Sequence, residues 1–216
     1  MTEYTGRVQP GQPQRRELPE LTIWKASVGA MDNNAYLLRS TATGEQVLID
    51  AADDAPQLLQ LTGDAGLTTV VTTHGDRDHW QALPEVARAT RARLLAPPLD
   101  AARIPIGTDP VDEGDTVQVG PVALEVLHVP GHTPGHIVLL YRDPEGSPHL
   151  FAGDTLFPGG PGRTTTPESF DALMTALEEK IFARLPDDTW VYPGHGDDTT
   201  LGAERPHLGE WRARGW

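Results

Sequence analysis

Short apolar runs separated by glycine, proline and polar residues make up most of this 216-residue chain. Runs that are rich in β-branched residues, or that alternate with polar ones, predict β-strands. They cover residues 21–24, 35–38, 46–50, 67–73, 94–96, 117–119, 122–129, 137–141, 150–152 and 190–192. Apolar residues at helical spacing predict helices over 56–62, 80–90 and 169–185, and another from about residue 200.

One predicted loop concentrates groups that can bind a metal ion. It follows the strand at 67–73 and carries His74, Asp76, Asp78 and His79 within six residues. A loop at the carboxyl end of a strand is the usual place for a site in an α/β protein. Four such groups in one loop suggest a metal ion. From these residues alone, the alternative is a polar loop that caps the following helix.

Three further predicted strands end beside a possible metal ligand. The residues that follow them are His132, Asp154 and His195, and each lies next to a glycine, which lets the backbone approach a crowded centre. One such loop is weak evidence for a metal site. Four of them, each at the end of a strand, strongly favour a shared site.

Composition narrows the classes of function. The formal net charge is −14 without a basic stripe, which argues against nucleic acid and anionic membranes as partners. The absence of cysteine excludes disulfides, thiolate ligands and a cysteine nucleophile. We expect residues 1–20 to form a flexible arm and residues 21–216 a single domain. The N-terminus lacks the apolar core of a signal peptide, so we expect a cytoplasmic protein that acts on a small molecule.

Four motifs resemble those of the metallo-β-lactamase superfamily of metallohydrolases. They are THGDRDH at 73–79, PGHTPGH at 130–136, GDTLF at 153–157 and YPGHG at 192–196. Within the superfamily, the chain over about residues 20–205 looks most like small glyoxalase II-type hydrolases. The resemblance implies an α/β fold, a four-layer αββα sandwich with a two-metal site at one edge.

The resemblance also implies seven ligands for two divalent metal ions, three for each ion and one carboxylate shared by both. The first ion would take His74, Asp76 and His132, the second Asp78, His79 and His195, and Asp154 would bridge them. Asp78 and Asp154 are the expected catalytic carboxylates. Zinc suits these ligands best, with iron or manganese as alternatives. Two such ions lower the pKa of a bridging water and polarise a substrate carbonyl.

Position 76 departs from the family pattern, which usually has histidine there. A third carboxylate makes the site less positive, so we expect it to raise the pKa of a bound hydroxide and to attract anionic substrates less. Two alternatives remain open. Asp76 either coordinates the first ion, or leaves the protein with one tightly bound ion in the second position.

Several other residues near the motifs have possible roles. Arg163 and Phe157 are candidate substrate-binding residues, Arg163 as a clamp for a carboxylate or as a loop anchor. His136 is expected to support the site without coordinating. Asp50 either orients a ligating histidine or caps a turn. His149 is expected in an exposed context.

The most favoured function is hydrolysis of a thioester, ester or lactone by a metal-activated hydroxide. One alternative is a mononuclear iron oxygenase that acts on a persulfide, which the same superfamily supports. Others are a lactonase or β-lactamase-like hydrolase and a non-catalytic metal-binding protein. Glyoxalase II carries a C-terminal helical region that holds glutathione, and few residues follow His195 here, so glutathione specificity is not expected.

Overall fold

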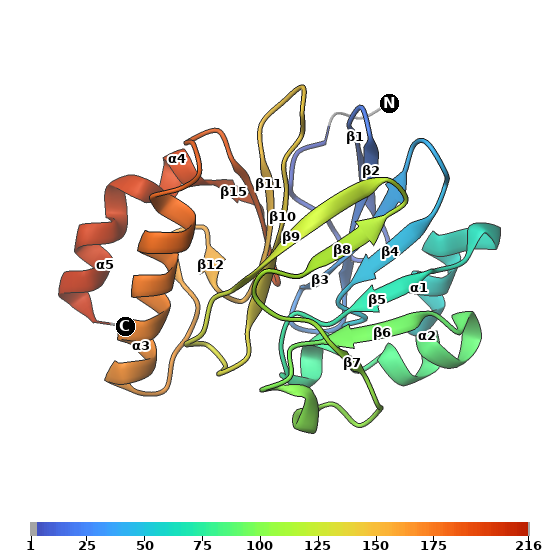
Figure 1. Cartoon of the computed structure of the whole chain (residues 1–216), viewed down its shortest axis with the longest axis horizontal. Coiled ribbons are helices and arrows are strands. Elements are labelled where there is room, and N and C mark those ends of the chain that lie inside the picture. Colours follow the sequence, from blue (N-terminus) through green and yellow to red (C-terminus); the bar gives the residue numbers. More distant parts are fainter. Residues whose placement is uncertain (1–3, 216) are drawn as a thin grey trace.

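Two β-sheets packed face to face form the centre of the molecule, and helices cover the outer face of each sheet (Figure 1). This computed structural model describes residues 4–215. Helices α1 and α2 lie on one outer side, and α3 to α5 lie on the other. The structure therefore confirms the four-layer αββα sandwich.

In both sheets, neighbouring strands largely follow one another in the order of the chain. The first has seven strands in chain order: β1 (Gln14–Glu17), β2 (Leu21–Val28), β3 (Asn33–Ser40), β4 (Gln46–Ile49), β5 (Thr69–Val71), β6 (Arg93–Ala96) and β7 (Asp109–Pro110). The second has six, in the order β15 (Thr199–Thr200), β14 (Trp190–Pro193), β11 (His149–Gly153), β10 (Ile137–Tyr141), β9 (Val122–His128) and β8 (Thr116–Val119). A small hairpin joins β12 (Leu156–Phe157) to β13 (Gly160–Pro161).

The helices are short, and several continue as tighter or wider turns. They are α1 (Ala55–Thr62), α2 (Leu83–Thr90), α3 (Pro167–Ala176), α4 (Leu201–Glu204) and α5 (Leu208–Arg214). Helix α3 continues as a π-helical segment, η4 (Leu177–Phe182). The 3-10 turns are η1 (Gly63–Ala65), η2 (Arg77–His79), η3 (Ala101–Arg103) and η5 (Arg205–His207). None of the helices in the described chain is long and apolar enough to cross a membrane.

The side chains of strand β10 contribute to two separate hydrophobic cores. Ile137, Leu139 and Tyr141 belong to the core between the sheets. Val138 and Leu140, which point the other way, belong to the core under α3. Because successive side chains of a strand point to opposite faces, a strand in the middle layers must be apolar throughout. This explains the uninterrupted apolar run at 137–141.

Parallel pairing brings distant loops to one edge of the molecule. Strands β4, β5 and β6 run parallel, so the loops after β4 and β5 leave the first sheet together. Strands β11 and β14 are also parallel, and the loops after them leave the second sheet together. A backbone hydrogen bond from Asn34 N to Gly194 O links the two sheets there. The predicted ligand loops therefore meet at one place.

The N-terminal segment differs from the flexible arm expected for residues 1–20, of which residues 1–3 lie outside the described chain. Strand β1 pairs with β2 in antiparallel register, and the Tyr4 hydroxyl donates to Asp198 at 2.6 Å. Strand β1 has the sequence QRRE, so it carries none of the apolar alternation by which a strand is predicted.

The helix predicted over residues 80–90 begins later. Residues 77–79 form the 3-10 turn η2, and α2 starts at Leu83, with Pro84 in its first turn. Proline suits that position because its nitrogen has no hydrogen to donate. The loop that carries Asp76 to His79 is therefore longer than the pattern indicated.

Candidate metal centre

All seven predicted ligands lie together at the edge where the loops meet. Their atoms fall into three groups, within each of which the possible ligand atoms lie within 4.8 Å of one another. The first group is His74 with Asp76 and His132, and the second is Asp78 with His79 and His195; the third, His74 with His79 and Asp154, lies between them. The structure thus brings together residues from four loops that span more than half of the chain.

The first group joins the loop after β5 to the loop between β9 and β10. His132 Nε2 lies 3.1 Å from Asp76 Oδ2, and His74 Nε2 lies 3.9 Å from the same oxygen. Both imidazoles thus face one carboxylate oxygen. The other oxygen, Oδ1, accepts a hydrogen bond from Arg103. Asp76 therefore turns one oxygen inward and one outward.

The second group joins the turn η2 to the loop after β14. His79 Nε2 lies 3.2 Å from His195 Nε2, and Asp78 Oδ2 lies 3.3 Å from His195 Nε2. The Nδ2 amide of Asn33, at the start of β3, donates to Asp78 Oδ2 at 2.9 Å. Asn33 lies between the strands predicted at 21–24 and 35–38, and nothing in its local pattern indicated this role.

Asp154 lies between the two groups. Its Oδ1 is 3.3 Å from His79 Nε2, and its Oδ2 is 3.6 Å from His132 Nε2 and 3.4 Å from His195 Nε2. The carboxylate is almost completely buried. It is thus the one carboxylate among the seven residues that faces histidines of both groups.

Outer hydrogen bonds orient each of the four imidazoles. The Nδ1 atoms donate to acceptors that cannot donate in return: His79 to Asp50 Oδ2 at 2.9 Å, His132 to the carbonyl of Arg163 at 2.7 Å, and His195 to the carbonyl of Met31 at 2.9 Å. His74 Nδ1 lies 3.0 Å from the Thr73 hydroxyl, which itself donates to Asp50. Each Nε2 atom is therefore turned inward, as in metal-binding histidines.

Two of the inward atoms support a cation at this place. His74 Nε2 and Asp154 Oδ1 are buried and have no hydrogen-bond partner among the described residues. A buried polar atom without a partner costs free energy unless another group satisfies it. Divalent cations accept imidazole nitrogen and carboxylate oxygen together. The donor set therefore fits metal ions.

Against the effect of burial, the facing carboxylates raise the pKa values of His79, His132 and His195, so a metal ion would take the place of protons on these imidazoles. Burial holds the pKa of His74 well below its usual value, so this imidazole is neutral at neutral pH. Burial alone would raise the pKa of Asp154, but the neighbouring His79 and His195 lower it well below its ordinary value. The hydrogen bond with His195 lowers the pKa of Asp78 to about 2. Both carboxylates are thus ionised at neutral pH.

Residues 28–195 match the protein family described as the Metallo-beta-lactamase superfamily. The chain belongs to this superfamily. A hydroxyacylglutathione hydrolase of Fuscovulum blasticum is 40% identical over 165 residues, which cover 76% of this chain and 62% of that protein. The chain thus spans less than two thirds of that relative. An uncharacterised protein of Aquifex aeolicus is 32% identical and is covered over 95% of its length.

Two similar solved structures share this fold. TTHA1623, solved in a di-iron-bound form, is 34% identical, with a TM-score of 0.69 over 84% of this chain and 96% of that chain. ETHE1 of Myxococcus xanthus is 29% identical, with a TM-score of 0.74 over 86% of this chain and 82% of that chain.

Three other residues considered from the sequence lie in or beside the superfamily motifs. His136 is buried behind the site, where its Nε2 accepts from the backbone N–H of Asp154 at 2.9 Å and its ring stacks on His74. Phe157 is half-buried, with its ring 6.3 Å from that of His195. The Arg163 side chain is exposed, and it is the carbonyl of Arg163 that contacts His132.

One expectation is wrong. His149 is almost completely buried, and its Nδ1 lies 2.9 Å from the Tyr192 hydroxyl. Its ring stacks between those of Tyr141 and Tyr192. Because β10, β11 and β14 are adjacent, these rings meet across three strands, of which β14 is distant in sequence. A turn just before His149 suggested exposure, but the pairing of the strands decides its burial.

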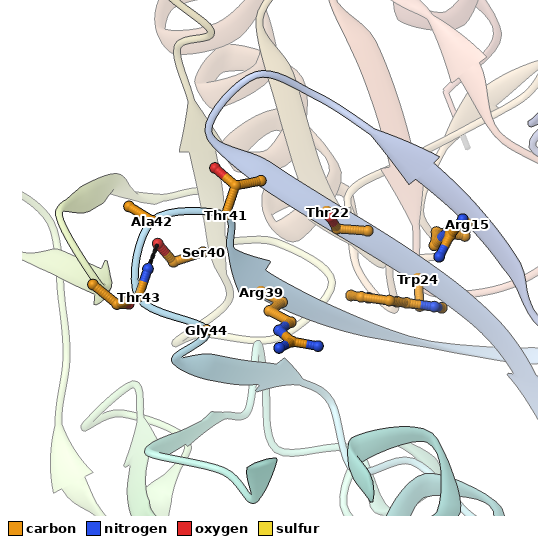
Figure 2. Close-up of a pocket in the computed structure, with 9 residues that line it drawn as sticks. All are labelled: Arg15, Thr22, Trp24, Arg39, Ser40, Thr41, Ala42, Thr43 and Gly44. Carbon is orange, nitrogen blue, oxygen red and sulfur yellow. Dashed lines mark hydrogen bonds between the residues drawn. The ribbon is translucent and has the colours of Figure 1, made fainter.

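A surface pocket of about 430 Å³ lies on the first sheet (Figure 2). Arg15, Trp24 and Arg39 line it beside the turn that follows β3. Asn33, which contacts Asp78, begins β3, whereas Arg39 and Ser40 end it. The pocket is thus at the opposite end of β3 from the metal centre, and none of the seven predicted ligands lines it.

Proposed function

We propose that this protein is a hydrolase that uses two divalent metal ions to cleave a thioester, ester or lactone bond in a small molecule. The observation that carries the proposal is the set of four imidazoles whose Nδ1 atoms are bonded outward and whose Nε2 atoms converge around Asp154. The named relatives support a thioester among these substrates, because several are hydroxyacylglutathione hydrolases.

The residues divide between the ions as the geometry suggests. His74, Asp76 and His132 would hold the first ion, Asp78, His79 and His195 the second, and Asp154 both. The ions would supply a hydroxide near neutral pH and polarise the substrate carbonyl. Zinc is the metal expected from the ligands. Iron remains an alternative metal, because a relative that is 34% identical was solved in a di-iron-bound form.

The chain's own groups prepare this chemistry. Asp50 fixes the His79 ring with its Nε2 facing the site. The ionised carboxylates of Asp78 and Asp154 are placed to hold a proton of the attacking water. Phe157, beside His195, offers an apolar wall to the substrate. Arg163 is exposed near His132, where it could contact an anionic substrate group.

The experiment that tests the proposal is elemental analysis of the protein followed by a substrate panel. The protein, purified without added metal and then supplied with zinc, manganese or iron in turn, should hold between one and two ions per chain. It should hydrolyse an acyl thioester faster than a lactone. Metal content below about a tenth of an ion per chain would contradict the metal centre.

The alternative is a mononuclear iron oxygenase that acts on a persulfide, and the likeness to ETHE1 of Myxococcus xanthus leaves it open. Two ligand groups on either side of Asp154 favour two ions, and hence hydrolysis, over this alternative. Oxygen consumption with a persulfide, one bound iron and no thioester hydrolysis would decide for the oxygenase.

We expect His195→Ala to lower the metal content by about one ion per chain. His195 belongs to the second group and lies beyond the first, so the ion held by His74, Asp76 and His132 should remain. Plasma emission spectrometry of wild type and variant, after the same dialysis, measures the difference. His207→Ala, which removes an exposed histidine on η5, is the matched control and should retain the full content. An unchanged metal content in His195→Ala would contradict the assignment of His195.

A further inference from the structure

Asp100 is a fully buried carboxylate that the sequence did not single out. It lies at the start of the 3-10 turn η3, in a proline-rich stretch with no regular pattern. Burying an ionised carboxylate is costly unless hydrogen bonds compensate it. The full burial of Asp100 therefore implies that hydrogen bonds from its neighbours compensate the carboxylate.

All three hydrogen bonds that Asp100 accepts through its side chain come from the two loops of the first metal group. Oδ2 accepts from the backbone N–H of Gly75 at 2.8 Å and from the Thr133 hydroxyl at 2.6 Å. Oδ1 accepts from the backbone N–H of Gly135 at 3.0 Å. Gly75 separates His74 from Asp76, and Thr133 follows His132. Asp100 thus fastens the two loops to each other.

The two glycines let the turn approach this closely. A Cβ atom at Gly75 would lie 2.8 Å from Cδ of Arg103 and 3.1 Å from Cβ of Asp100. A Cβ atom at Gly135 would lie 2.9 Å from the backbone nitrogen of Asp100. At a contact shorter than about 3 Å one of the two atoms must move, and at Gly135 that atom is the backbone nitrogen of Asp100. Another residue at Gly135 would therefore push the turn away from the loop of His132, whereas one at Gly75 would displace the Arg103 side chain.

Arg103, at the end of the same turn, completes the arrangement. Its guanidinium donates to Asp76 Oδ1, which leaves Oδ2 facing His132 and His74. It also brings a positive charge to the carboxylate that stands where the superfamily usually has a neutral histidine. The turn from Asp100 to Arg103 therefore contacts the side chain or the adjoining backbone of all three residues of the first group.

The second group has a different support. His79 is oriented by Asp50, Asp78 by Asn33, and His195 by the carbonyl of Met31. Within the described chain, the hydrogen bonds of Asp100 and Arg103 reach none of these three ligands. A change at Asp100 should therefore weaken metal binding by the first group and leave metal binding by the second group unchanged.

We propose that Asp100 is the positioning residue of the first metal ion, and that it acts by holding the loops of His74 and His132 at a fixed separation. The inference rests on the two-ion centre proposed above, but on no assumption about the substrate. Outer groups of this kind change metal affinity by about 10- to 100-fold when they are removed.

The test measures zinc affinity by chelator competition in proteins that retain one group each. His195→Ala keeps the first group intact, and His132→Ala keeps the second. Asp100→Asn preserves the shape of the side chain but removes its charge and one acceptor. Added to His195→Ala, it should weaken zinc binding about 10- to 100-fold. Added to His132→Ala, it should leave zinc affinity within about twofold.

A milder variant and a control keep the test decisive if Asp100→Asn fails to fold. Thr133→Val removes one of the three hydrogen bonds and should weaken only the first-group ion, by about threefold. Glu204→Gln alters a buried carboxylate that also accepts one backbone N–H and one hydroxyl, from Gly159 and Thr199, and should change neither affinity.

The outcomes separate this inference from the metal centre itself. Equal losses in both one-group proteins, or a loss in neither, would overturn the role of Asp100 while the centre stands. Wild-type protein that binds no zinc would overturn the centre, and the inference with it. A loss confined to the first group supports both.

Discussion

Replacement of Asp154 by alanine should abolish activity and release both metal ions together. Asp154 is the carboxylate that faces histidines of both groups, at 3.3 to 3.6 Å from His79, His132 and His195. Its removal takes one ligand from each ion and one negative charge from between two dications. We expect kcat to fall on the order of 10⁴-fold or more, as when other essential catalytic groups are removed.

Metal content and rate must be measured on the same preparation of Asp154→Ala. Glu145→Ala removes a carboxylate from an exposed turn between β10 and β11 and is the control; both its activity and its metal content should match wild type. Loss of activity with both ions retained would contradict the bridging role. It would assign Asp154 to proton transfer instead.

Lys25→Met should destabilise the fold by about 3–5 kcal/mol. The Lys25 side chain is fully buried, and its Nζ lies 2.6 Å from Asp198 Oδ1, 2.8 Å from the carbonyl of Gly6 and 2.6 Å from the carbonyl of Gly196. Methionine fills the space but leaves the buried Asp198 without its cation. An uncompensated buried charge costs far more than an exposed one.

Urea unfolding of Lys25→Met and wild type gives the difference in the free energy of unfolding. Arg7→Met breaks a neighbouring pair with Asp197, whose side chains are 80% and 48% exposed, and should cost less than about 1 kcal/mol. Lys25→Met with Asp198→Asn should recover part of the loss, because the stranded charge is gone. A loss below about 1 kcal/mol in Lys25→Met would show that the pair contributes nothing to the fold.

Most of the strands, the main helices and the seven clustered residues could be predicted because each has a local signature in the sequence. Alternating or continuous apolar runs specify strands, and the ligands follow these strands beside glycines. The roles of Asn33, Asp100 and Lys25 could not be predicted from such patterns. Each is a polar residue whose partners lie at least 19 residues away in the sequence. Only the assembled fold defines their contacts.

The need for the assembled fold also explains two of the differences between the predictions and the structure, at strand β1 and at His149. Strand β1 joins the sheet through its backbone, and its polar side chains carry no apolar signal. His149 is buried by neighbours on β10 and β14, which its own surroundings in the sequence do not reveal. In both cases, pairing between strands outweighs the local pattern.

The division of the ligands between the two sheets has a consequence for biosynthesis. His74 to His79 follow a strand of the first sheet, whereas Asp154 and His195 follow strands of the second. As the chain leaves the ribosome, His195 emerges more than 100 residues after His79. Neither ion can gain its full set of ligands until both halves of the chain have docked. Metal loading should thus be a late event that locks the assembled halves together, and metal-starved cells should accumulate a protein that is more readily cut by proteases.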